Sequence, residues 1–270
     1  MTSYFSDDSM LRQVTREWIV AFGGPRALLM QAAHPVAFVG FFAHTGSLAD
    51  PYARLRRTAE VMDTIAWGPR EEADRATRRV RAMHAKVRGR TTQAAGRFPA
   101  GTPYAADDPE LLLWILATLA DSVVLVYERY VRRLGDGERE ALWEDYRVVG
   151  RLFGLGDEEM PEDWGAFDAY MNRMLASGDL LVTDRARELA VDIVMHPPLP
   201  PAARPLLELV NQTTVGLLPP AIRRQYGFRW DPLREAALRG GAEYAKRVLV
   251  PLAPEKLRLV PQARRLAVAG

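Results

Sequence analysis

Apolar residues recur with helical spacing along almost the whole of this 270-residue chain. No stretch alternates apolar and polar residues in the way that predicts a strand, and no internal repeat is present. Residues 91–106 read as a loop, and two or three helices are expected after the Pro-rich residues 197–205. The pattern predicts an all-α fold, with residues 1–270 forming a single domain of about nine to eleven helices.

Local signals mark where several of these helices begin and end. Asp50-Pro51 and Asp108-Pro109 each place an Asp before a Pro, the pattern of an N-cap followed by the first helical residue. We expect the first of these helices to end near Trp67 and the next to run from Pro69 to Gly89. Thr183 is predicted to cap a later helix.

Composition excludes several classes of protein. The chain has no cysteine, which rules out disulfides, thiolate nucleophiles, iron–sulfur clusters and a thiolate-ligated haem. Its formal net charge is only +2, with arginines interleaved among acids, so we expect no nucleic-acid partner. The longest apolar stretch, Leu111 to Tyr127, predicts a buried core helix rather than a membrane span. Residues 1–16 show no secretory signal, which predicts a cytoplasmic protein.

Motifs of the common enzyme classes are absent. The sequence has no phosphate-binding glycine loop, no dinucleotide fingerprint, no nucleophile elbow and no H-E-x-x-H zinc motif. No glutamate stands three residues before a histidine, as the carboxylate-bridged di-iron bundles require. Nucleotide enzymes, serine hydrolases, zinc proteases and ferritin-like oxidases are therefore disfavoured.

Three polar residues fall on the apolar sides of two consecutive predicted helices. Arg54 and Thr58 share a side with Leu55 and Met62, and His84 follows Val80 by four residues. Because a short connection joins the helices, we expect an antiparallel hairpin in which the three side chains face one another. Buried polar groups must be satisfied by each other or by something bound.

Plainer interpretations stay open for each of these residues. A lone His on an apolar side is more often a satisfied core histidine, and an Arg there usually extends its charge to solvent. His34, before Pro35, and His44 each read as caps or hydrogen-bonding residues. Together with His84 they would also supply a non-haem, His-ligated metal site.

Short motifs at matching spacing resemble those of the rubber oxygenases (latex-clearing proteins) and MpaB-type oxygenases, over roughly residues 16–265. The motifs are Leu28 to Pro35, His44 to Ser47, Asp50-Pro51, Arg54 to Thr58, Trp67-Gly68, Met83 to Gly89, Tyr104 to Trp114, and Leu217 to Trp230.

The resemblance implies an all-helical, globin-like fold that holds haem b. His84 matches the histidine that binds the haem iron, and Arg54, Arg57 and Thr58 match a motif near the haem. A neutral imidazole binds iron, and an arginine pairs with a haem propionate or positions an oxidant. The expected function is a haem-dependent oxygenase that uses O₂ on an apolar small molecule.

The chain lacks one residue that takes part in the mechanism of this family. Rubber oxygenases use a distal glutamate as base, whereas no Asp or Glu occurs here between Glu17 and Asp50. His44, or less favourably His34, would then do acid–base work, with Arg54 and Thr58 beside it. The alternatives are a non-catalytic protein that binds or senses haem or a hydrophobic ligand, and the non-haem metal enzyme. Nothing in the sequence indicates the oligomeric state.

Overall fold

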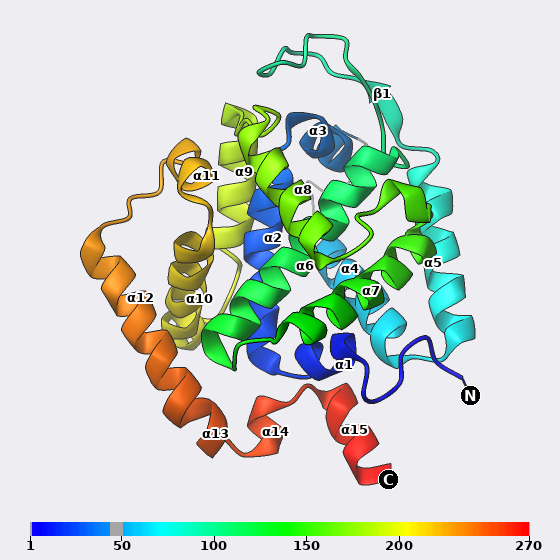
Figure 1. Cartoon of the computed structure of the whole chain (residues 1–270). Helices are drawn as coiled ribbons and strands as arrows, with labels where there is room; N and C mark the ends of the chain where they lie inside the picture. The colour runs from blue at the N-terminus through cyan, green and yellow to red at the C-terminus, as the bar shows by residue number, and fades with distance from the viewer. Residues whose placement is uncertain (1, 44–50, 270) are drawn as a thin grey trace.

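The computed structural model describes residues 2–43 and 51–269. The chain is 71% helical, with two short strands, so the predicted all-α class is confirmed and the helix count roughly matches. Figure 1 shows α2 and α6 side by side in the middle of the molecule, with the remaining helices around them.

The first half of the chain holds α1 (Met10–Thr15), η1 (Trp18–Phe22), α2 (Gly23–Ala32), α3 (Pro35–Ala43), α4 (Pro51–Trp67), α5 (Arg70–His84), β1 (Arg88–Arg90), β2 (Pro103–Ala105) and α6 (Pro109–Tyr130). The second half holds α7 (Asp136–Phe153), η3 (Asp157–Glu159), α8 (Trp164–Ala176), α9 (Asp184–Met195), η4 (Pro201–Ala203), α10 (Arg204–Leu217), α11 (Pro220–Gln225), α12 (Pro232–Tyr244), η5 (Ala245–Leu249), α13 (Val250–Leu252), α14 (Glu255–Arg258) and α15 (Pro261–Ala269). The C-terminal part thus contains more helices than the two or three expected.

Side-chain caps begin the helices where the sequence predicts them. The Asp108 carboxylate accepts from the backbone N–H of Glu110 at 2.9 Å, and Thr183 accepts from that of Ala186 at 3.1 Å. These bonds satisfy N–H groups that a helix start leaves without an internal partner. Trp67 ends α4 as expected, whereas Asp50 lies outside the described residues.

The segment after His84 corrects two expectations. The predicted helix to Gly89 ends five residues early, and β1 pairs antiparallel with β2 in a chain for which no strand was predicted. Gly89 stands opposite Tyr104, and a Cβ on Gly89 would lie 2.5 Å from the tyrosine hydroxyl. The pairing therefore depends on a close approach that only glycine allows. Strands of three residues are too short for a period-2 pattern to show.

The core centres on large side chains from α6, α7 and α8. Trp114 and Trp143 are fully buried, and the rings of Trp143 and Phe167 lie 4.4 Å apart. Trp143 also donates its ring N–H to the carbonyl oxygen of Pro161 at 2.9 Å, so the indole is satisfied as well as packed.

Within the described residues, α6 is the one helix long and apolar enough to cross a membrane, by length and composition. It is longer than the apolar stretch from Leu111 to Tyr127 suggested, because Pro109 and Tyr130 belong to it. Of its apolar window, 56% is buried inside the protein. This burial and its packing against α2 agree with the expected core helix.

A buried arginine joins three helices of this centre. Arg26 of α2 donates from Nε to the carbonyl oxygen of Leu217 at 2.8 Å and from Nη1 to the Ser122 hydroxyl at 2.6 Å. Its Nη2 forms an ion pair with Asp121 of α6 at 2.7 Å. The pair explains how α6 carries a carboxylate in an otherwise apolar stretch.

Candidate functional site

His84 lies at the rim of a hollow between three helices. It is the last residue of α5 and is half-buried. The hollow has a volume of 510 Å³, within the range of about 300–1,000 Å³ that small-molecule sites occupy. Its lining comes from the end of α5, the start of α6 and the end of α7, namely Arg78, Arg81, His84, Ala85, Asp107, Leu112, Phe153 and Gly154.

Helix periodicity and a helix end bring these side chains together. Ala73 and Thr77 are buried on the inner side of α5, and Val80 and His84 continue that side outward. Gly154 ends α7 with a φ of 103°, a conformation that favours glycine. A Cβ there would lie 3.4 Å from Cδ of Arg81, so the turn closes tightly over the Arg81 stem.

The hollow combines three kinds of chemistry. His84 offers an imidazole, Leu112 and Phe153 supply apolar surface, and Arg78 and Arg81 supply positive charge. Asp107 forms an ion pair with Arg88 at 2.5 Å. Neither Arg78 nor Arg81 forms an ion pair among the described residues. A metal-binding ring nitrogen, apolar walls and guanidinium groups are what an iron porphyrin with two carboxylates requires.

Sequence reasoning missed Arg78 and Arg81. Both lie in a charged stretch that reads as a solvated helix surface. The available signal was their spacing: with His84 they follow one another at intervals of three residues, which keeps them near one side of α5.

The expected hairpin is present, but the exposure of its residues differs from the expectation. Helices α4 and α5 pack against each other. Arg57 and Thr58, however, are exposed rather than buried on an apolar side. Thr58 does lie on the same side of α4 as Ile65, seven residues later. On this side of α4, Leu55 and Met62 are half-buried against the core and Ile65 is fully buried, whereas Thr58 between them is exposed.

Two of the predicted site residues cannot be placed. The side chain of Arg54 and the whole of His44 lie outside the described residues. Neither Arg57 nor Thr58 lines the hollow at His84. The convergence of Arg54, Arg57, Thr58 and His84 therefore stays a prediction.

His34 is buried and held as a helix cap. It is 7% exposed, and its Nδ1 accepts from the backbone N–H of Ala37 at 3.3 Å, at the start of α3. Its ring lies 5.4 Å from that of Phe98. Burial lowers the pKa of His34 below its usual value, and the negative charge of Asp179 opposes this. The contacts favour a capping role, the plainer of the two interpretations.

This lowered pKa predicts how stability changes with pH. The neutral imidazole is favoured in the folded chain, so stability is fully present above about pH 6.5, the ordinary His pKa, and is lost as pH falls. His34→Asn keeps a capping side chain without the charge. We expect urea unfolding to show that wild type loses more stability than His34→Asn between about pH 7.5 and 5.5. Equal losses would contradict a depressed His34 pKa.

Among the described residues, no three His, Cys, Asp or Glu side chains gather as a metal site. His196 is exposed and lies 3.7 Å from Asp192. The described part of the chain thus gives no support to a non-haem site on His34, His44 and His84, of which His44 is not described.

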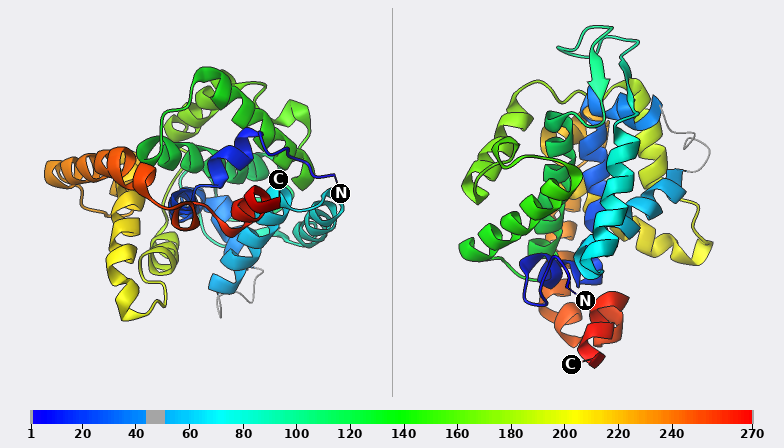
Figure 2. Two further views of the ribbon diagram at one scale, coloured as in Figure 1. Left: turned by 90° about the horizontal axis from the view of Figure 1, so that it is seen from below. Right: turned by 90° about the vertical axis from the view of Figure 1, so that its right-hand side faces the viewer.

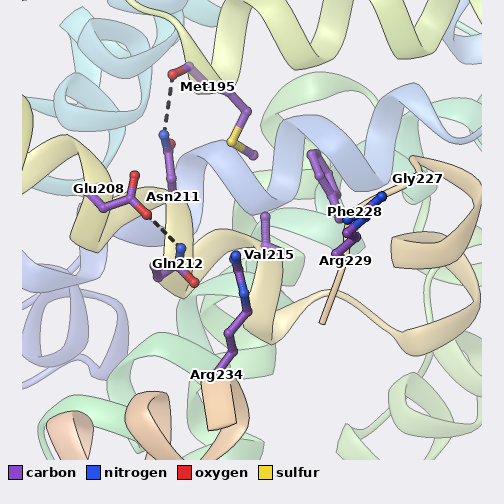
Figure 3. A pocket seen from close by; sticks show the side chains of 9 residues that line it. All are labelled: Met195, Glu208, Asn211, Gln212, Val215, Gly227, Phe228, Arg229 and Arg234. Carbon is purple, nitrogen blue, oxygen red and sulfur yellow. Dashed lines mark hydrogen bonds between the residues drawn. The ribbon is translucent and has the colours of Figure 1, made fainter. Parts of the chain in front are cut away.

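A second hollow, of 310 Å³, lies between the end of α9, helix α10 and the start of α12 (Figure 3). Two of its polar lining residues already form hydrogen bonds within the protein. Gln212 donates to Glu208 at 2.6 Å, and Asn211 donates to the carbonyl oxygen of Met195 at 3.3 Å. It contains no histidine and none of the predicted site residues.

Comparison with known proteins gives the family. Residues 12–247 match the model of the catalytic domain described as "ER-bound oxygenase mpaB/B'/Rubber oxygenase". The chain belongs to this oxygenase family. The resemblance found in the sequence motifs is thereby confirmed, and membership of the MpaB/rubber oxygenase family supports an enzyme of the oxygenase type that acts on a small molecule with O₂.

Two relatives of the chain carry no assigned activity. The uncharacterized protein Rv2237 of Mycobacterium tuberculosis and the uncharacterized protein Mb2261 of Mycobacterium bovis are each 28% identical over 189 residues. The match covers 68% of this chain and 69% of each relative. No solved structure matches the chain significantly.

Proposed function

We propose that this MpaB/rubber oxygenase family member is a haem b-dependent oxygenase of an apolar small molecule, with His84 as the iron ligand. The observation that carries the proposal is the lining of the hollow at His84, which combines an imidazole, apolar walls and two guanidinium groups without ion-pair partners among the described residues. Bound haem would supply the iron at which O₂ is activated.

Each residue of the site has a proposed role. His84 binds the iron through a ring nitrogen, and Arg78 and Arg81 pair with the haem carboxylates. Leu112 and Phe153 keep water from the apolar face of the ring system.

The remaining roles follow from the family motif and the missing carboxylate. Arg54, Arg57 and Thr58 act near the haem, as in the family motif. His44 does the acid–base work, since no Asp or Glu occurs in the sequence between Glu17 and Asp50. His34 is the weaker candidate, since its Nδ1 already caps α3.

The test is haem reconstitution of the purified protein followed by oxygen uptake. The proposal predicts a Soret band at one haem per chain, and O₂ consumption that depends on an added aliphatic or aromatic hydrocarbon. Haem binding with no uptake across such a panel would favour the non-catalytic binding or sensing protein. Failure to bind haem would overturn the proposal and favour a non-haem metal enzyme.

A further inference from the structure

Positive charge is concentrated near the C-terminal end of the chain. Residues 245–265, here called the C-terminal arm, hold six basic side chains and one acidic one, Glu255, a net charge of +5. Because the whole chain carries only +2, the rest carries −3. The basic residues are Lys246, Arg247, Lys256, Arg258, Arg264 and Arg265.

Large apolar side chains on the same arm face solvent. Leu249, Leu252 and Leu257 are 52%, 77% and 70% exposed. Leucines of the core are by contrast almost wholly buried, for example Leu29 and Leu142 at 0%. Exposed leucines interleaved with cations are typical of segments that lie in a membrane interface.

The arm is fixed to the body of the protein. Figures 1 and 2 show α13, α14 and α15 together at one end of the molecule, next to the N-terminal elements. Val260 donates its backbone N–H to the carbonyl oxygen of Arg16 at 2.8 Å, and Leu259 forms a bridge with Glu17. Lys246 donates to the carbonyl oxygen of Glu128 at 3.1 Å.

These contacts place a further interfacial side chain beside the arm. Trp18 begins η1, directly after Glu17, and is 43% exposed. Tryptophan is enriched where an apolar medium meets water, because its ring is apolar and its N–H is polar. The Trp18 ring and Leu257 belong to elements that contact each other, η1 and α14, whereas Leu249 and Leu252 lie in η5 and α13, just before α14 in the chain.

Part of the arm's charge is used within the protein. Arg247 pairs with Glu243, and Arg258 pairs with Glu17 at 3.2 Å. With the charges of Glu243 and Glu17 included, the net charge of the arm falls from +5 to +3. Lys256 and Arg265 form no ion pair among the described residues, so their charge is available to a partner.

We infer that the C-terminal arm docks this protein on an anionic lipid surface, with Leu249, Leu252 and Leu257 inserted among the lipids and Lys256 and Arg265 at the head groups. The inference does not rest on haem or on the proposed reaction. It concerns residues that lie largely beyond the family match, which ends at residue 247. A lipid surface is the occupant that offers negative charge and apolar volume together.

Vesicle co-sedimentation of the full chain tests the inference. We expect binding to phosphatidylcholine vesicles containing about one third phosphatidylserine, and at least about tenfold less to phosphatidylcholine alone. Raising the salt from about 0.1 M to about 0.5 M should weaken binding, because the charges are exposed. The triple variant Leu249→Ser/Leu252→Ser/Leu257→Ser should lose binding about tenfold or more.

A matched triple variant outside the arm is the control. Leu206, Leu209 and Leu233 are 44%, 48% and 80% exposed, and Leu206→Ser/Leu209→Ser/Leu233→Ser should bind vesicles like wild type. Circular dichroism and urea unfolding establish that both variants are folded. Equal losses in the two variants, or no binding by folded wild type, would overturn the inference. So would vesicle-independent dimerisation that only the arm variant abolishes, because a second copy would then cover these leucines.

Discussion

Arg26→Leu is expected to lower the free energy of unfolding by about 3 kcal/mol or more, as the loss of one partner from a buried ion pair generally does. The substitution removes the donors to Leu217 and Ser122 and leaves Asp121, whose side chain is 23% exposed, without its cation. An unsatisfied buried carbonyl and an uncompensated charge both disfavour the folded state. Urea unfolding followed by circular dichroism measures the effect.

An exposed ion pair supplies the comparison. Arg132 makes two bonds of 2.7 Å to Glu138, and its side chain is 47% exposed. Arg132→Leu should cost no more than about 1 kcal/mol, since water screens the pair and replaces its bonds. The double variant Arg26→Leu/Asp121→Leu should recover part of the Arg26 loss. Losses of similar size in Arg26→Leu and Arg132→Leu would show that the Arg26 network does not hold the three helices together.

Helix starts were predictable because their determinants are local. Asp108 and Thr183 accept backbone bonds from residues two or three positions ahead, so the sequence around each cap contains the whole interaction. The end of α5 at His84 was not predictable in this way. Strand β1 begins four residues later, at Arg88, and its pairing places Gly89 opposite Tyr104. Tyr104 lies beyond a loop, and the helical pattern of the sequence does not indicate the path of that loop.

The solvent exposure of individual side chains was harder to predict, even where the sequence pattern assigned them to the correct side of a helix. Periodicity places Thr58 and Ile65 on one side of α4, but elements distant in sequence decide which part of that side is covered. The burial of His34 has the same origin, since Phe98 comes from the loop between β1 and β2. For Arg78 and Arg81 the sequence pattern alone does not distinguish a solvated surface from the lining of a hollow.

The second large effect concerns His84. His84→Ala should weaken haem binding by about tenfold or more and change the absorption spectrum, because no other residue lining the hollow offers a ring nitrogen to the iron. His196→Ala is the matched control, since His196 is exposed at the end of α9 and lines neither hollow. Both variants should remain folded, because neither histidine belongs to the buried core.

The measurement is a haem titration of wild type, His84→Ala and His196→Ala, followed by absorbance in the Soret region, with His34→Asn as a further variant. We expect one haem per chain and the same spectrum in wild type, His196→Ala and His34→Asn, with the loss confined to His84→Ala. Unchanged haem stoichiometry and spectrum in His84→Ala, together with their loss in His34→Asn, would rule out His84 as the iron ligand and assign the iron to a different histidine.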